Sequence, residues 1–170
     1  MSQHLTVTAD PDLKESFKDA MGNVAAAVAI VTAYGDDAPW GATVSAFMSL
    51  SMEPPMLLVS LQKTSSLLPR LTVGTDFGVN VLAADQGELA TKFAQKAAPS
   101  HAQKYAGVSW SFRDGVPALD GTHAWVRLTV SRLVEAGDHV LVLGDVLEAE
   151  PNSREPLIYH QRAYGTHARH

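Results

Sequence analysis

The chain has 170 residues, of which 46% are hydrophobic and 18% charged, and its formal net charge is −5. This length and composition predict one folded domain over residues 1–170. The acidic balance argues against a nucleic-acid partner or an anionic membrane surface. Cysteine is absent, which excludes disulfides, iron–sulfur clusters, thiolate zinc sites and cysteine nucleophiles. Redox chemistry in this protein would therefore need an organic cofactor or a metal held by other ligands.

The chain starts with a polar stretch, Met1–Asp12, which has no apolar core of the signal-peptide type. The apolar-rich segment Val24–Ala33 is too short to span a bilayer as a helix. We therefore expect a cytoplasmic protein without a membrane segment, and loose ends at residues 1–12 and 166–170. Asp10 as the cap and Pro11 as the first helical residue predict a short amphipathic helix that stops at Gly22.

Segments rich in Val, Ile and Leu follow this helix and predict strands. They are Val24–Tyr34, Trp40–Leu50, Met56–Leu61, Phe77–Leu82, Trp125–Val134, His139–Glu148 and Leu157–His160. The turn Ala136–Asp138 predicts a hairpin between two of them. Val140–Leu143 is apolar at every position, which is typical of a strand covered on both faces.

Two further helices are predicted, a short one at Ser65–Leu71 and one over Asp85–Lys96 with Asp85 as its cap. The Gly-, Pro- and Ser-containing region Ala97–Gly121 has weak periodicity, which indicates a long excursion over the surface. About six or seven strands with few helices favour a mainly β fold, a small antiparallel barrel with helical additions.

The common nucleotide and hydrolase motifs are missing from the chain. It has no G-x-G-x-x-G, no phosphate loop and no G-x-S-x-G elbow. Its seven histidines show no metal-binding spacing, so we expect no metal site.

The segment Gly41–Pro55 sets small hydroxyl residues among apolar ones. Such a strand leaves its main chain approachable, so a flat polar ring system could bind along it. The alternative is a tightly packed strand whose hydroxyls bond locally.

The segment Gln62–Ser66 carries one ammonium and three hydroxyls where a strand ends and a helix is expected. This arrangement suits a phosphate cradle at the N-terminus of the helix. It equally suits ordinary capping by Thr64 or Ser65 with Lys63 in solvent. His139 follows a tight turn, where it either faces a ligand at the barrel rim or bonds to a backbone carbonyl.

Taken together, these segments resemble the flavin reductase family of two-component monooxygenases over about Phe17 to Tyr164. The resemblance is carried by Gly41–Pro55 (the family's G-x-T-x-x-S/A-F-x-S-x-S-x-x-P-P), Lys63–Ser66, Asn80-Val81, Gly137-Asp138-His139, Gly144-Asp145-Val146 and Pro156–His160 with Tyr164-Gly165. It implies a split β-barrel of the Greek-key, FMN-binding type with a few flanking α-helices. It also implies a homodimer that reduces free FMN or FAD with NADH or NADPH and supplies reduced flavin to a separate monooxygenase.

The resemblance also implies residue roles. It places His139 by the nicotinamide as the catalytic residue. The flavin-binding residues that it implies are Thr43, Val44, Ser45, Ala46, Ser60, Leu61, Lys63, Ser65, Ser66, Asn80, Phe93 and Tyr164. Hydride transfer between the two cofactors needs no protein nucleophile, which is compatible with a chain that lacks cysteine.

The chain departs from the family pattern at Ala26-Ala27, where the family often has Thr-Gly, and at Ala46, where relatives can carry a polar residue. The first alternative is a non-enzymatic flavoprotein that holds FMN tightly as a sensor or carrier. A second is a split-barrel oxidase acting on a pyridoxine-like phosphate, although the arginines form no cluster in the sequence. A third is a structural barrel that binds neither flavin nor nicotinamide.

Overall fold

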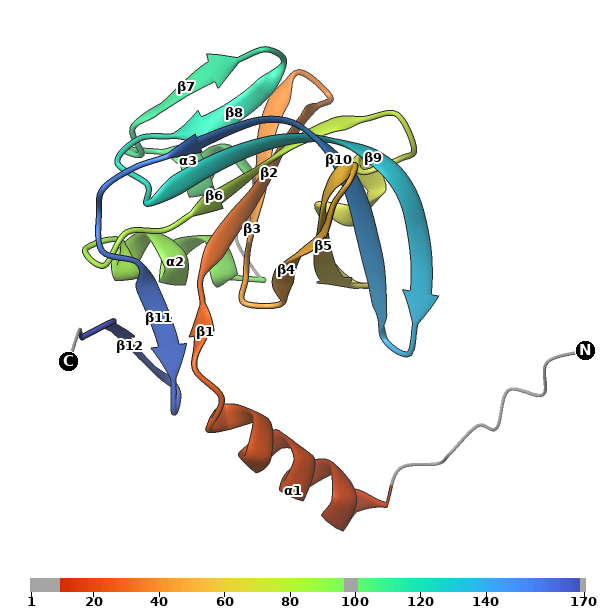
Figure 1. Ribbon diagram of the computed structural model, residues 1–170, viewed down its shortest axis with the longest axis vertical. Coiled ribbons are helices and arrows are strands. Elements are labelled where there is room, and N and C mark those ends of the chain that lie inside the picture. Colours follow the sequence, from red (N-terminus) through yellow and green to blue (C-terminus); the bar gives the residue numbers. More distant parts are fainter. Residues whose placement is uncertain (1–9, 97–100, 169–170) are drawn as a thin grey trace, which may run out of the picture.

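The computed structural model describes residues 10–96 and 101–168 (Figure 1). Its largest sheet has seven antiparallel strands in the order β3-β2-β6-β9-β10-β5-β4. In chain order these strands are β2 (Ala29–Gly35), β3 (Ala38–Val44), β4 (Phe47–Met52), β5 (Pro55–Gln62), β6 (Asp76–Val81), β9 (Ala124–Ala136) and β10 (His139–Pro151). The mainly β composition predicted from the sequence is confirmed.

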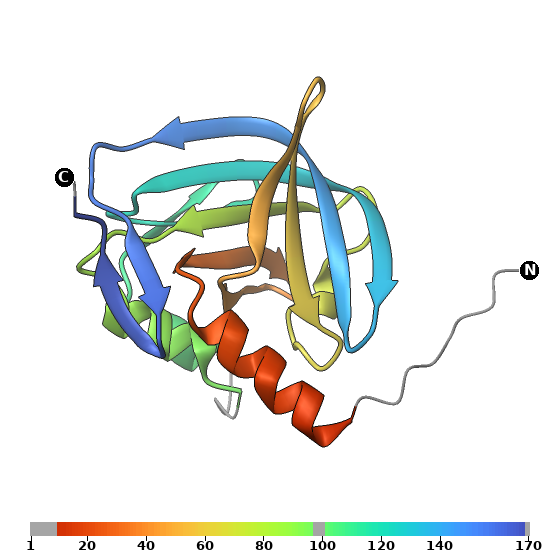
Figure 2. The same ribbon diagram turned by 60° about the horizontal axis from the view of Figure 1, so that its bottom comes forward.

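The sheet curls because its two edge strands are consecutive in the chain. β3 and β4 lie at opposite ends of the strand order, yet only Ser45 and Ala46 join them. A two-residue link reaches about 10 Å at most, so the two edges must come together. The Ser60 backbone N–H donates to the Ala46 carbonyl at 2.9 Å, which ties the link to β5. Figure 2 shows the strands wrapped around a common interior, as expected of a split barrel.

Apolar side chains from these strands fill the interior of the curled sheet. The fully buried members of this core include Val31, Val59, Phe77, Leu128 and Val142. Along the start of β10, buried residues alternate with half-buried ones. Within a single chain, only one face of Val140–Leu143 is therefore fully covered, whereas the sequence predicted cover on both faces.

The helices match the sequence-based expectation in part. α1 (Pro11–Gly22) begins as predicted, and the Asp10 carboxylate accepts from the Asp12 backbone N–H at 3.0 Å. α2 (Gly87–Ala94) is shorter than predicted, because Asp85 does not cap it. Asp85 instead forms an ion pair with Arg154.

The predicted helix over Ser65–Leu71 is wrong in kind. Ser66 and Leu67 form a turn, and only the single 3-10 turn η1 (Leu68–Arg70) is helical. Pro69 falls within that short turn. A phosphate cradle at this point therefore cannot rest on the N-terminus of an α-helix.

The region predicted as a surface excursion contains regular structure. It holds α3 (His101–Tyr105) and a hairpin of β7 (Trp110–Arg113) and β8 (Val116–Leu119). Every residue of β8 is buried, so this part of the prediction is wrong. The four-residue segments are too short for periodicity to reveal them. Residues 97–100 lie outside the described residues.

A small second sheet has the order β1-β11-β12, with β1 (Ala26–Ala27), β11 (Leu157–His160) and β12 (Ala163–Thr166). The predicted strand Val24–Tyr34 is therefore divided between two sheets, and β12 was not predicted. Loose ends were predicted at residues 1–12 and 166–170, but α1 begins at Pro11 and β12 ends at Thr166, so regular structure extends into both. Residues 1–9 and 169–170 of these ends lie outside the described residues. No described helix combines the length and apolar character needed to cross a membrane.

Candidate functional site

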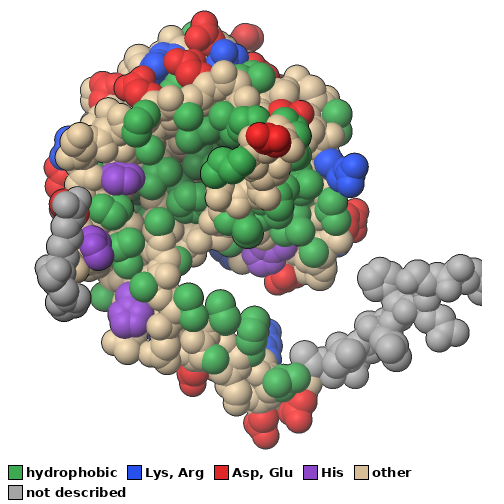
Figure 3. Space-filling view, in the orientation of Figure 1, with side chains coloured by type: hydrophobic (Ala, Val, Ile, Leu, Met, Phe, Trp, Pro, Cys, Tyr) green, Lys and Arg blue, Asp and Glu red, His purple; other side chains and the backbone are tan. Residues whose placement is uncertain are grey.

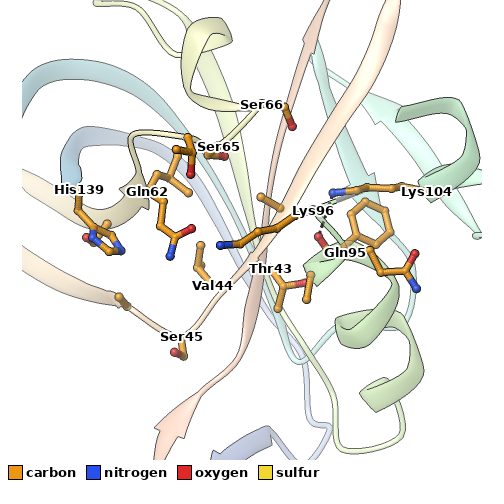
Figure 4. Close-up of a pocket in the computed structure, with 17 residues that line it drawn as sticks. Thr43, Val44, Ser45, Gln62, Ser65, Ser66, Gln95, Lys96, Lys104 and His139 are labelled. Carbon is orange, nitrogen blue, oxygen red and sulfur yellow. Dashed lines mark hydrogen bonds between the residues drawn. The ribbon is translucent and has the colours of Figure 1, made fainter. Parts of the chain in front are cut away.

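A pocket of about 360 Å³ lies where the curled sheet is split (Figure 4). Its wall comes from β3, the Ser45-Ala46 link, the end of β5 and the turn after it, the end of α2, α3 and the first residue of β10. The lining residues are Ala42, Thr43, Val44, Ser45, Ala46, Ser60, Leu61, Gln62, Thr64, Ser65, Ser66, Phe93, Ala94, Gln95, Lys96, Lys104 and His139.

Most of the residues predicted for the site line this single pocket. They are Thr43, Val44, Ser45, Ala46, Ser60, Leu61, Ser65, Ser66, Phe93 and His139. The curl of the sheet brings them together from segments that are far apart in the sequence. Their roles in binding flavin and nicotinamide remain predictions.

Lys63 and Tyr164 lie outside the pocket lining. The Lys63 ammonium forms an exposed ion pair with Glu135 at 2.9 Å. Tyr164, on β12, packs against Tyr159 with their ring centroids 5.4 Å apart. Of the predicted phosphate cradle, Ser65 and Ser66 therefore line the pocket and Lys63 does not, and the role of Lys63 stays a prediction.

Asn80 is also outside the pocket, and it is fully buried. Its side-chain amide donates to the Ile30 carbonyl at 3.0 Å and to the Thr32 hydroxyl at 3.1 Å. Its amide oxygen accepts from the Leu119 backbone N–H at 2.8 Å. The Thr32 hydroxyl in turn donates to the Pro117 carbonyl at 2.6 Å. Asn80 thus fastens the β7–β8 hairpin to the sheet and has no exposed group for a ligand.

The pocket side of β3 is supported by α2. The Thr43 hydroxyl donates to the Ala90 carbonyl at 2.6 Å, a partner that is distant in the sequence and not the local one that the alternative interpretation of the segment expected. Phe93 is 1% exposed and packs on Gly41, where an added Cβ would lie 2.6 Å from the Phe93 ring atom Cε1. Glycine at position 41 therefore lets the aromatic ring rest against the strand.

α3 closes one end of this wall. The Tyr105 hydroxyl donates to the Trp40 carbonyl at 2.9 Å, and its ring packs edge-on against Phe93 with centroids 5.0 Å apart. Burial raises the pKa of Tyr105, because the phenolate form is penalised away from water. The protonated hydroxyl therefore stays available as a donor that anchors α3 to the edge of β3.

Lys96 and Lys104 are pocket residues that the sequence analysis did not single out. Lys104 is only 7% exposed, and its ammonium donates to the Phe93 carbonyl at 3.1 Å. Burial lowers the pKa of Lys104. Among the lining residues that are described, two are lysines and none is acidic. No local pattern indicates these lysines, because only the packing of α3 on β3 and α2 places Lys104 here.

His139 occupies the opposite side of the pocket from Lys104 (Figure 4). Its Nδ1 lies 2.7 Å from the Asp138 carboxylate. This hydrogen bond to His139, together with the positive charge that the histidine can carry, lowers the pKa of Asp138. The backbone-carbonyl partner considered from the sequence is thus replaced by a neighbouring carboxylate. Nδ1 is held by Asp138, and no hydrogen bond from the part of the chain that the structure describes engages Nε2, which is available to a ligand.

Comparison with known proteins places this site in a family. Residues 21–168 match the family model described as a flavin reductase like domain. The FMN reductase (NADH) SmoA of Agrobacterium fabrum is 34% identical over 155 residues, covering 91% of this chain and 86% of the relative. The reductase component of 4-nitrophenol 4-monooxygenase/4-nitrocatechol 2-monooxygenase of Rhodococcus opacus is 34% identical over 152 residues, covering 89% and 80%.

The fold is similar to that of a solved relative. The NADH:FAD oxidoreductase SgcE6 of Streptomyces globisporus, solved in complex with NAD and FAD fragments, superposes with a TM-score of 0.85 at 29% identity. The match covers 94% of this chain and 96% of that chain. The resemblance predicted from the sequence motifs is thereby confirmed. From its fold, its pocket and these matches, the chain belongs to the family of proteins with a flavin reductase like domain.

Proposed function

We propose that this protein is a flavin reductase that transfers a hydride from NADH to FMN or FAD and supplies the reduced flavin to a separate monooxygenase component. The observation that carries the proposal is the pocket at the split of the sheet. Its described lining includes two lysines and no carboxylate, although the whole chain has a net charge of −5. Such a pocket favours an anionic ligand of the size of a nucleotide.

The residues present fit a flavin nucleotide. A volume of about 360 Å³ lies within the range of small-molecule sites, about 300–1,000 Å³. The small side chains of Ala42, Ser45, Ala46 and Ser60 line one part of the pocket and leave room for a flat ring against the main chain. The lysine ammonium groups and the hydroxyls of Ser65 and Ser66 suit the phosphate.

The bound flavin and nicotinamide supply the hydride chemistry, and the protein supplies position and electrostatics. The main chain around Thr43–Ala46 binds the ring, and its backbone N–H groups favour negative charge there. His139 hydrogen-bonds the nicotinamide through Nε2, while Asp138 fixes the orientation of the imidazole through Nδ1. No proton has to leave His139 in this role.

The protein acts as a cytoplasmic homodimer in this proposal. No residue of α1 is buried within the chain, and Leu13, Phe17 and Met21 are at least half exposed. A 12-residue helix is marginal in water without tertiary packing. Figure 3 shows apolar side chains along α1 and on the face of the body beside it. A second copy of the chain is the partner that would cover these surfaces.

Anaerobic oxidation of NADH with FMN, FAD and riboflavin offered in turn tests the proposed activity. We expect oxidation that depends on added flavin and a protein that purifies largely without it. NADPH serves as a second donor to test the choice of nicotinamide. A protein that purifies fully loaded with FMN and does not oxidise either nicotinamide would contradict the proposal and favour the sensor or carrier.

The role of His139 is tested by His139→Ala. We expect a higher KM for NADH or a lower kcat, with little change in flavin affinity, because the histidine contacts the nicotinamide and not the flavin. His160→Ala is the control, since His160 is exposed on β11 outside the pocket. Steady-state constants for NADH that match those of the unaltered protein would remove His139 from the site.

A further inference from the structure

A second pocket, of about 410 Å³, shares no lining residue with the pocket at the split of the sheet. Its wall comes from the β7–β8 hairpin, the turn after β8, the start of β9, the end of β10 and the segment after β10. Figure 1 shows these segments together at the end of the sheet away from the β9–β10 turn. The volume lies within the range of small-molecule sites.

Two polar groups in this second pocket are buried without a partner. The indole Nε1 of Trp125, a residue that is 2% exposed, has no hydrogen-bond partner among the described residues. Thr122 is 3% exposed, and no hydrogen bond within the described part of the chain engages its hydroxyl. Its backbone carbonyl, in contrast, accepts from the Asn152 side-chain amide at 3.1 Å. Buried polar groups without a partner are rare and costly in folded proteins, which favours an external partner here.

The charged side chains around the second pocket are balanced among themselves. Arg113 pairs with Glu150 at 2.8 Å, and Arg154 pairs with Asp85. The Asp120 carboxylate forms no ion pair with any described residue and accepts from a serine hydroxyl. An anion would therefore meet paired cations and an unpaired carboxylate, in contrast to the two lysines of the pocket at the split. The second pocket thus favours a neutral ligand.

The two unpartnered groups differ in the hydrogen bonds that they can form. The indole N–H can only donate, whereas the threonine hydroxyl can donate or accept. A carboxamide carries a matching pair of groups, a carbonyl oxygen that accepts and an N–H that donates. The buried residues Ala118 and Leu119 line the same pocket and suit the hydrocarbon part of such a ligand.

We propose that the second pocket binds a small neutral carboxamide through Trp125 and Thr122. The carbonyl oxygen of the ligand accepts from the Trp125 indole N–H, and the amide N–H donates to the Thr122 hydroxyl. Because the indole N–H has almost no accessible surface, the ligand reaches it when a side chain at the rim shifts. Arg113 is placed to do so, since its guanidinium lies over the Trp125 ring at 4.1 Å from the centroid and its side chain is 34% exposed.

NMR titration of the full chain with ε-caprolactam, a cyclic carboxamide without an aromatic ring, tests this proposal. The indole N–H resonance of Trp125, assigned with Trp125→Phe, should move downfield and saturate with a Kd of about 1 mM, as expected for a ligand of this size. The Trp40 indole N–H already donates to the Gly35 carbonyl at 2.9 Å, so its resonance should stay in place. Saturation with FMN should leave the caprolactam titration unchanged, because the two pockets share no lining residue.

Thr122→Val removes the hydroxyl with little change of shape. It should raise the Kd for caprolactam about fivefold, the effect of one hydrogen bond. The urea midpoint should hold or rise, because no described group loses a partner. Thr129→Val is the matched control, since Thr129 lies on β9 outside the pocket, and it should leave the affinity unchanged. Cycloheptanone, which has the ring and the carbonyl but no N–H, should bind about fivefold more weakly than caprolactam to the unaltered protein. The two should bind equally to Thr122→Val.

Four results would overturn the proposal. A Trp125 resonance that caprolactam leaves in place would mean that the pocket holds only solvent. Equal caprolactam affinity of Thr122→Val and the unaltered protein would remove the hydroxyl from the site. Tighter binding of cyclohexanecarboxylate than of caprolactam would make the pocket an anion site. A titration that FMN abolishes would place caprolactam at the split of the sheet. Caprolactam binding is measured without nicotinamide or turnover, so failure of the proposed function would leave this test intact.

Discussion

Gly41→Ala tests whether the pocket wall is packed as closely as the structure has it. The new Cβ would lie 2.6 and 2.7 Å from two ring carbons of Phe93 and 3.2 Å from the Tyr105 hydroxyl. Phe93 is 1% exposed and Tyr105 is 6% exposed, so neither ring can move into solvent without giving up its packing. Overpacking of this kind costs about 1–3 kcal/mol.

The assay is urea unfolding followed by tryptophan fluorescence at a fixed protein concentration, because a dimer gains apparent stability with concentration. With a urea dependence of about 1–3 kcal/mol per molar, the midpoint should fall by about 1 M. FMN affinity should fall as well, since Phe93 lines the pocket. In Gly22→Ala, the control, the added Cβ meets nothing within 4 Å, and the midpoint should hold or rise. A Gly41→Ala protein as stable as the original would refute the reasoning.

Three further outcomes are expected. Thr32→Val should destabilise the protein by about 1–3 kcal/mol in urea unfolding, because it leaves the buried Pro117 carbonyl and the Asn80 amide without their hydroxyl partner; a neutral result would mean that this network is not required. Phe17→Ser should shift sedimentation toward the monomer, whereas Phe112→Ser, another exposed aromatic, should not, and equal behaviour of the two would argue against α1 as the dimer surface. His139→Ala should raise the pKa of Asp138 toward its ordinary value of 3.8, because the hydrogen bond and the positive charge that lower this pKa are lost with the imidazole. The stability that the contact contributes is fully present above pH 3.8 and is lost as the pH falls through the lowered pKa. Carboxyl NMR follows the titration, and an Asp138 pKa that does not move in the variant would exclude the contact in solution.

The sequence predicted which residues line the pocket better than it predicted the bounds of the strands and helices. The Gly41–Pro55 motif and the turn before His139 are local signals, and both segments reach the pocket. What local signals could not give was the break of one predicted strand at Ser45-Ala46. Nothing in the alternation of small and apolar residues marks that point, and only the closure of the sheet fixes it.

The residues whose surroundings the sequence did not predict share a physical cause. Asn80 lies in a motif of the family resemblance, but its polarity serves buried hydrogen bonds between strands and the β7–β8 hairpin. Lys63 is a residue type expected to contact phosphate, yet its ammonium bonds to Glu135 on the neighbouring hairpin. No local pattern indicates Lys104, because its position in the pocket depends on contacts with α2 and β3 that lie far away in the sequence. Tertiary contacts decided each case.

Because the Ser45-Ala46 link joins the two edge strands and also lines the pocket, the ligand would bind where the two edges of the sheet meet. A molecule bound there contacts β3 and β5 at once, and so it holds together the two sides of the split along which the barrel would open. Occupancy should therefore slow amide hydrogen exchange along β3 and β4 more than in the β9–β10 hairpin. Release of the product should then restore faster exchange along this edge of the sheet.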